Sequence, residues 1–310
     1  MKYKKRRFIP GECMHIYQRT VNGFNIFYDL EDYLVFYTIF SVISGLYGIS
    51  ILQLCMMIDH VHMLISSESL SEVSAFVRHY SSLFVMEYNS DIGRHGQLFY
   101  KSFGSAPKNG SKKIRSTIVY IGNNPVEKKL CSFAPEYRWN FLAYIDERHP
   151  FSESKPISRC SFRLKKALKE VKRLSMSRSY LTYGFLRRVF GGLDQKDREY
   201  LTDFIIAEYY PFDSDALLSF YESKEDMFHA MRSTAGSDYD IREKYFAGSD
   251  TIYRDMIAFV RSKADVSPAR RTIVLSAEEK IELVGRMQFG IDASTSQFAK
   301  FMHLKLNPKM

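Results

Sequence analysis

Residues 49–66, ISILQLCMMIDHVHMLIS, contain two apolar segments separated by Ile58 and Asp59. Residues 49–57 are rich in isoleucine, leucine and methionine, a composition that favours a buried strand. Residues 60–66 continue the apolar pattern after a reversal of only two residues, so they are expected to pair with that strand in the antiparallel sense. The two segments therefore predict a hairpin within an antiparallel sheet.

The segments before the hairpin supply another strand and a helix. Residues 14–22, MHIYQRTVN, alternate in polarity and end at an Asn-Gly turn, which predicts a strand. Residues 29–44 place apolar side chains along one side and begin at Asp29, so we expect a capped helix. Gly45 and Gly48 end this helix before the hairpin begins.

Further elements follow the hairpin. Ser69 and Glu72, three residues apart, form a capping box that opens a second helix. The other expected elements are a strand over residues 97–103, a loop over residues 104–111 and a helix over residues 112–124. This order predicts the α+β class, with helices packed on one central antiparallel sheet.

The chain changes character near residue 150, where His149-Pro150 and Pro156 indicate a linker. We expect three regions: a mixed α/β domain over residues 1–150, a helical extension over residues 151–272, and a candidate helix-turn-helix over residues 273–310. Helices in the extension are expected over residues 162–174, 195–206, 240–245 and 251–261.

Two segments beyond residue 150 each allow two interpretations. Residues 162–174 place six Lys/Arg opposite an apolar face, a pattern that fits contact with duplex DNA and equally fits a cover for the sheet. Residues 294–301 resemble the second helix of a helix-turn-helix, which would place Thr295, Ser296 and Lys300 near a DNA groove. A plain helical hairpin fits residues 294–301 equally well.

The positive charge is concentrated in two blocks. The formal net charge is +9 and the isoelectric point is about 9.2, a balance that favours anionic partners such as nucleic acid. Residues 94–129 contain eight Lys/Arg and one acid, and residues 155–188 contain eleven Lys/Arg and one acid. A solvated surface is the alternative interpretation, but two separate blocks of one sign favour DNA.

The composition disfavours several classes of protein. No apolar run reaches the roughly 18 residues that span a bilayer, and no apolar segment follows the basic N-terminus as it does in a signal peptide. The four cysteines form no CxxC pair, so neither a zinc site nor a disulfide framework is indicated. A cytoplasmic protein fits these features best.

His60 and His62 are candidate metal ligands. Residues two apart in a strand point to the same face, so both imidazoles can reach one ion while Val61 turns toward the core. Neutral imidazole is a common ligand of divalent metals. A purely structural role is the alternative, since a His-x-His pattern alone is a weak signal.

Tyr120 and Asn124 are the second candidate pair. They lie four residues apart on an expected helix and therefore project from one face. A tyrosine hydroxyl can attack a phosphodiester and hold the DNA as an ester, and the Asn124 carbonyl oxygen is a suitable ligand for Mg²⁺ or Mn²⁺. Packing of Tyr120 and a simple turn at Asn124-Pro125 are the alternatives.

The two motifs resemble a known family. MIDHVHMLI, residues 57–65, is similar to the HUH strand of single-tyrosine transposases (IS200-like), and IVYIGNNPVEKKL, residues 118–130, resembles the YIxxNP segment of the REP-associated branch. The segments GRHGQLFYKSF and SFAPEYRWNFLAYI also match in order and spacing. The resemblance covers roughly residues 8–147 and departs from the family pattern at residues 105–111.

The resemblance implies a ferredoxin-like sheet, with Tyr120 as nucleophile and His60, His62 and Asn124 as ligands of Mg²⁺ or Mn²⁺. It implies metal-dependent cleavage and strand transfer of single-stranded DNA beside hairpins, through a 5′-phosphotyrosine intermediate. A homodimer is one arrangement found in such proteins. The alternative function is a domesticated protein that binds hairpin DNA without cutting it.

Basic residues around these motifs are candidate DNA contacts, because Lys and Arg supply most sequence-independent affinity for DNA. They are Arg19, Arg94, Lys101, Lys112, Lys113, Arg115, Lys128 and Lys129. Phe99, Tyr100 and Phe103 lie among them, and both base stacking and packing within the sheet fit these aromatic rings.

Overall fold

The computed structural model describes residues 7–100, 102–234, 249–264 and 266–305. The expected helix over residues 240–245 and the candidate DNA contact Lys101 lie outside the described residues. Within the described ranges, no helix is both long enough and apolar enough to cross a membrane.

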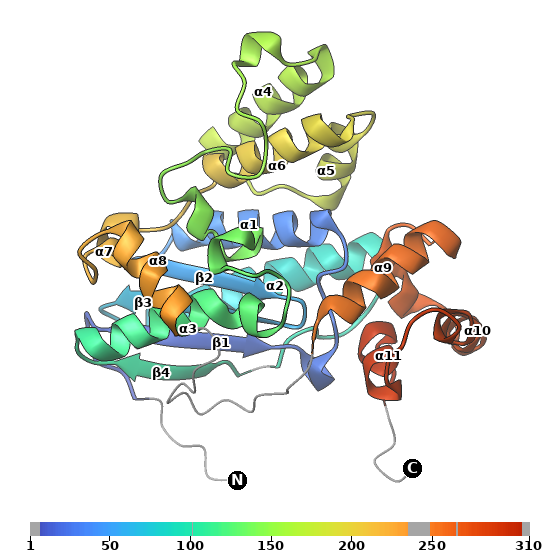
Figure 1. The fold of residues 1–310 in the computed structure, drawn as a ribbon, viewed down its shortest axis with the longest axis horizontal. Coiled ribbons are helices and arrows are strands. Elements are labelled where there is room, and N and C mark those ends of the chain that lie inside the picture. Colours follow the sequence, from blue (N-terminus) through green and yellow to red (C-terminus); the bar gives the residue numbers. More distant parts are fainter. Residues whose placement is uncertain (1–6, 101, 235–248, 265, 306–310) are drawn as a thin grey trace.

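A four-stranded antiparallel sheet forms the centre of the protein (Figure 1). Its strands are β1 (Cys13–Arg19), β2 (Ile49–Met57), β3 (His60–Ser67) and β4 (Gly104–Lys108), in the order β2-β3-β1-β4. With helix α1 (Leu30–Ser44) between β1 and β2 and helix α2 (Leu70–Ile92) between β3 and β4, this is the ferredoxin-like arrangement. The expected fold class and the hairpin of β2 and β3 are therefore confirmed.

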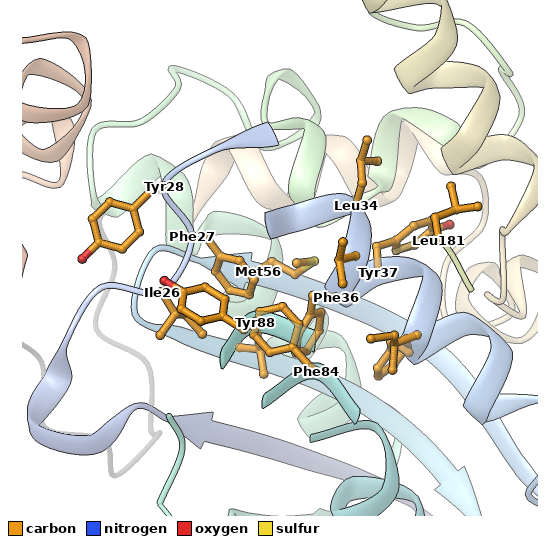
Figure 2. Packing of buried hydrophobic residues seen from close by; sticks show 14 of the residues in the cluster. Ile26, Phe27, Tyr28, Leu34, Phe36, Tyr37, Met56, Phe84, Tyr88 and Leu181 are labelled. Atoms are coloured by element: carbon orange, nitrogen blue, oxygen red, sulfur yellow. The ribbon is translucent and has the colours of Figure 1, made fainter. Parts of the chain in front are cut away.

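Helices cover both faces of the sheet. Helices α1 (Leu30–Ser44) and α2 (Leu70–Ile92) pack on one face, and α3 (Ser111–Glu127) packs on the other. Because strand side chains alternate, Met14 and Ile16 lie in the core beneath α1 and α2, whereas Cys13 lies in the core beneath α3. Figure 2 shows Phe36, Phe84 and Met56 packed together in the first of these cores.

The remaining helices build outward from this sheet. They are α4 (Phe162–Met176), α5 (Tyr183–Phe190), α6 (Gln195–Glu208), α7 (Ser214–Leu218), α8 (Lys224–Ser233), α9 (Thr251–Lys263), α10 (Ala277–Gln288) and α11 (Thr295–Met302). Short 3₁₀ turns span Val21–Gly23, Ala134–Glu136, Arg138–Asn140, Leu142–Tyr144, Ile157–Arg159 and Ala269–Val274. Helices α5 and α6 pack on α1, α8 packs on α3, and α4 is held outside by α5 and α6 (Figure 1).

The edge strand differs from the sequence prediction. In the strand expected over residues 97–103, Phe99 forms a bridge to Thr20, whereas the expected loop over residues 104–111 contains β4. The sequence Gly104–Lys108 has no apolar alternation because β4 lies at the edge and is only partly buried. Pro107 is tolerated there, since an edge strand needs fewer backbone donors.

Gly104 is required by the ring of Tyr17. A Cβ atom added at Gly104 would lie 1.9 Å from Cζ of Tyr17, which pairs with it across the sheet. We expect Gly104→Ala to lower the free energy of unfolding by about 1–3 kcal/mol through overpacking. Urea denaturation would measure the loss. Gly184→Ala is the matched control, because no heavy atom lies within 4 Å of its added Cβ.

Arg270 ties the C-terminal part of the chain to the two helices beneath the sheet. Its guanidinium is 1% exposed and pairs with Asp32 of α1 at 2.9 Å and with Asp91 of α2 at 2.5 Å. It also lies 4.0 Å from the ring centroid of Tyr183, whose hydroxyl donates to Asp32. The buried guanidinium thus contacts Asp32, Asp91 and Tyr183 at the same time.

Removal of this cation is expected to be costly. Arg270→Met leaves the fully buried Asp32 carboxylate without its counter-charge, and we expect a loss of about 3–5 kcal/mol in unfolding free energy. Arg187→Met is the control, since Arg187 pairs with Asp91 at 2.6 Å but is 53% exposed, and a loss below about 1 kcal/mol is expected. Equal losses in urea denaturation would contradict this assignment.

Candidate functional site

His60 and His62 lie on the face of β3 that α3 covers. Arg19 pairs with His60 and Tyr17 pairs with His62 across the neighbouring strand β1. His62 is 1% exposed, while His60 lies at the end of the strand and is partly open. The ring centroids of the two histidines are 4.8 Å apart and their planes are perpendicular, so the structure brings the predicted pair together.

A third histidine joins them from β1. His15 Nε2 lies 3.0 Å from His62 Nδ1, and the two rings stack with centroids 5.3 Å apart. Burial lowers the pKa of His15 to about 3, with Lys108 adding to the effect, and burial also holds the pKa of His62 well below its usual value. Both rings are therefore neutral near pH 7, the form that binds metals.

His15 was not among the site residues predicted from the sequence. Its strand was predicted, but only the register against β3 brings it to His62, which is 47 residues away in the chain. The signal in the sequence was that residues 14–22 place His15 and Tyr17 on one face of a strand.

Asp59 orients His60. Its carboxylate oxygen lies 2.5 Å from His60 Nδ1, so Nε2 is the nitrogen of that ring directed away from Asp59. Burial acts to raise the pKa of Asp59, but His60, Lys300 and Lys128 together hold it below its usual value. The carboxylate is therefore charged and can fix the imidazole as a hydrogen-bonded partner.

The ring of Tyr120 contacts the rings of His62 and His15. The tyrosine lies on α3, and its ring meets His62 edge-on, with centroids 5.6 Å apart, and His15 at 5.8 Å. The contact forms within one chain because α3 packs on β2 and β3 of its own sheet. The predicted nucleophile and the predicted histidine pair thus lie on the same face.

Asn124 lies one helical turn beyond Tyr120 and is 7% exposed. Its amide nitrogen donates to the carbonyl oxygen of Tyr120 at 2.9 Å, so Oδ1 is the end of the side chain that can accept or bind a cation. Helix α3 continues through Pro125 to Glu127, and the turn considered for the Asn-Pro pair does not form.

Gly122 and Asn123 hold α3 against α8. A Cβ atom at Gly122 would lie 2.8 Å from Cε of Met231, so the glycine permits close packing of α8. Asn123 Nδ2 donates to the carbonyl oxygen of Met231 at 2.8 Å. The extension therefore holds the helix that carries Tyr120.

The donor set suits a divalent cation in its chemistry. Imidazole nitrogens and an amide oxygen are ordinary ligands for such ions. Across the described residues, no group of three or more His, Cys, Asp or Glu could hold a metal.

Residues from the far end of the chain approach Asp59. Asp250 donates its backbone N–H to the carbonyl of Lys128, and burial and the nearby Asp59 raise the pKa of its carboxyl to about 6. Lys300 of α11 lies beside the loop after β1, where a Cβ at Gly23 would meet its Cε at 3.6 Å. No signal in the sequence linked Asp250 or Lys300 to this place.

The candidate DNA contacts on α3 occupy both of its ends. Lys112 and Lys113 are exposed in its first turn, and Lys128 and Lys129 follow its last turn. The two ends are about 24 Å apart, with Tyr120 between them.

Three other candidates have partners within the protein. Arg94 donates to Asn89 and to the carbonyls of Gly96 and Gln97, and so orders its own loop. Arg115 pairs with Asp226 at 3.5 Å. The guanidinium of Arg19 lies 5.4 Å from the ring centroid of Tyr17, beside the histidine face.

The three aromatic candidates for base stacking differ in how far their side chains are buried. Phe99 and Phe103 are 4% and 9% exposed and belong to the core beneath α1 and α2, which supports the packing interpretation for both. Tyr100 is 48% exposed, so its ring alone among the three is accessible to a base.

Comparisons with known proteins identify the segment that carries this site. The chain is similar to a solved structure described as "Structure of the REP associates tyrosine transposase bound to a REP hairpin", at 15% identity and a TM-score of 0.42, over 52% of this chain and 96% of that one. No curated protein matches the chain. A family model described as "Transposase IS200 like" matches residues 13–124, which confirms the resemblance drawn from the two motifs.

Proposed function

We propose that this protein cleaves and rejoins single-stranded DNA beside a hairpin, with Tyr120 as the nucleophile. The observation that carries the proposal is the edge-on contact of Tyr120 with His62, at a centroid distance of 5.6 Å, on the face where His60 and His15 also lie. A protein that only binds DNA has no need for a tyrosine, an asparagine and two histidines in this arrangement.

The reaction assigned to Tyr120 is a transesterification. Its phenolic oxygen attacks the phosphorus of the scissile phosphodiester and loses its proton to solvent, while the bond from phosphorus to the 3′ oxygen breaks. The leaving 3′ oxygen takes a proton from solvent, so the products are a 5′-phosphotyrosine and a strand with a 3′-hydroxyl. A second 3′-hydroxyl then attacks the phosphotyrosine and restores the tyrosine, so no external energy source is needed.

His60, His62 and Asn124 would hold the divalent cation, Mg²⁺ or Mn²⁺. When bound, the cation acts as a Lewis acid that stabilises charge on the phosphate. Asp59 directs Nδ1 of His60, and His15 engages Nδ1 of His62, so the two rings keep fixed orientations. Lys128 and Lys300 place positive charge at the edge of the site, where a DNA phosphate would approach.

We further propose that one chain contains a complete site. The tyrosine helix α3 packs on the strands that carry the histidines of the same chain, and α8 anchors it through Gly122 and Asn123. A homodimer is therefore not required to bring Tyr120 to His60 and His62.

The nucleophile is tested by trapping the covalent intermediate. The protein is incubated with Mg²⁺ or Mn²⁺ and single-stranded hairpin DNA from the flanks of its own gene, then denatured and resolved on a gel. We expect a protein–DNA adduct that disappears in Tyr120→Phe and persists in Tyr47→Phe, a control at a tyrosine that contacts His79 elsewhere in the fold. Tight binding without an adduct, with both metals and several flanking substrates, would favour the non-cleaving hairpin-binding protein.

The ligand assignment is tested by metal binding in the absence of DNA. We expect His60→Ala to abolish Mn²⁺ binding measured by calorimetry, because it removes a proposed direct ligand. His15→Ala should weaken binding about 10–100-fold, since His15 only orients His62. His79→Ala is the control, because His79 contacts Tyr47 elsewhere in the fold. Unchanged affinity in His60→Ala would contradict the assignment.

A further inference from the structure

Helix α4 has two faces with opposite roles. Leu164, Ala167, Leu168 and Val171 are buried against α5 and α6. At 100° per residue these four side chains occupy about 100° of the helix surface. The apolar side of α4 is therefore fully used within the protein, and Figure 1 shows the helix at the outer end of the molecule.

The outward side of α4 is a row of cations, here called the basic face. It consists of the exposed side chains of Lys165, Lys166, Lys169, Lys172 and Arg173. They lie within about 120° of the helix circumference and span about 12 Å along the axis. Two exposed apolar side chains flank them, Phe162 at 83% and Met176 at 77% exposure.

Within the described residues, few of the positive charges on the basic face are neutralised by acids. Glu170, the one acid on α4, pairs with Arg188 at 2.5 Å. Lys165 donates to the carbonyl of Ser158, but in the described part of the chain no ion pair or hydrogen bond engages the side chains of Lys166, Lys169 and Lys172. Like charges four residues apart destabilise a helix, so this arrangement is unfavourable until an anion covers it.

We propose that the basic face of α4 binds the sugar–phosphate backbone of a DNA duplex outside the cleaved strand. One DNA strand presents a phosphate about every 3.4 Å along the axis, so the length of the basic face matches three to four phosphates. The first turn of α4 contains no acid, and the helix N-terminus adds favourable partial charge for phosphate. The choice of DNA as the polyanion rests on the proposed function.

The same observations argue against a membrane as the occupant. A helix that binds a bilayer surface needs an apolar face directed at the lipid. On α4 that face is buried against α5 and α6, and only Phe162 and Met176 remain exposed at the two ends. These two side chains lie on the same side of the helix as the cations but about 21 Å apart along it, too far to form a continuous apolar surface, so contact with phosphates is favoured.

The experiment is a salt titration of binding to a 30-base-pair duplex of random sequence, followed by fluorescence anisotropy. In the triple variant Lys166→Gln, Lys169→Gln, Lys172→Gln we expect the slope of log affinity against log salt to fall by about 2.7, at about 0.9 per lost phosphate contact. Between 50 and 200 mM salt, the parent should then lose roughly 40-fold more affinity than the variant loses.

The matched control removes the same charge elsewhere. Arg78→Gln, Lys263→Gln, Arg271→Gln changes three exposed cations on α2, on α9 and in the 3₁₀ turn Ala269–Val274. Its salt slope should stay near that of the parent. If the salt slope fell equally in both triple variants, the loss of net charge alone would explain the effect and the proposal would be overturned. An unchanged slope in the α4 variant would also overturn it.

Binding to vesicles that contain one-third phosphatidylserine is measured in parallel, to test a membrane as the alternative partner of the basic face. Weak vesicle binding that the α4 substitutions leave unchanged supports the assignment to DNA. Strong vesicle binding that the α4 substitutions abolish, with duplex binding intact, would overturn it. The readout is independent of cleavage, because the duplex carries no single strand. A missing adduct would count against Tyr120 as nucleophile, and an unchanged slope would count only against the basic face.

Discussion

The candidate site depends on the register of β1, the strand between β3 and β4. Tyr17 pairs with His62 on one side and with Gly104 on the other. Side chains alternate along a strand, so this register turns His15 and Tyr17 toward the face that holds His62. A shift by one residue would turn His15 into the apolar core beneath α1 and α2, and the contact between the two histidines would be lost.

The helical extension is coupled to this sheet through buried polar groups. Arg270 joins the C-terminal part to α1 and α2, and Tyr28 donates to the carbonyl of Phe301 at 2.5 Å. Helix α8 holds α3 at Met231, and Asp250 binds the backbone at the end of α3. The position of Tyr120 therefore depends on residues far outside the family-matched segment, which makes the extension part of the support of the site.

Charge alone was a coarse guide to DNA contacts. Arg94 and Arg115 belong to basic blocks in the sequence, yet their guanidinium groups are engaged by a loop and by Asp226 in the folded chain. The cations of α4 belong to a similar block, but their buried neighbours direct them outward and away from acids. Burial and pairing, which composition does not contain, decide which cations can reach a phosphate.

The sequence by itself determined the features that lie within single elements. The hairpin, the shared face of His60 and His62, and the one-turn spacing of Tyr120 and Asn124 follow from periods of 2 and 3.6 residues. Only the tertiary structure decided that β4 lies at Gly104–Lys108, that His15 meets His62, and that Tyr120 stands over both in one chain. Such contacts depend on pairing and packing between distant segments, and no local pattern specifies which segments meet.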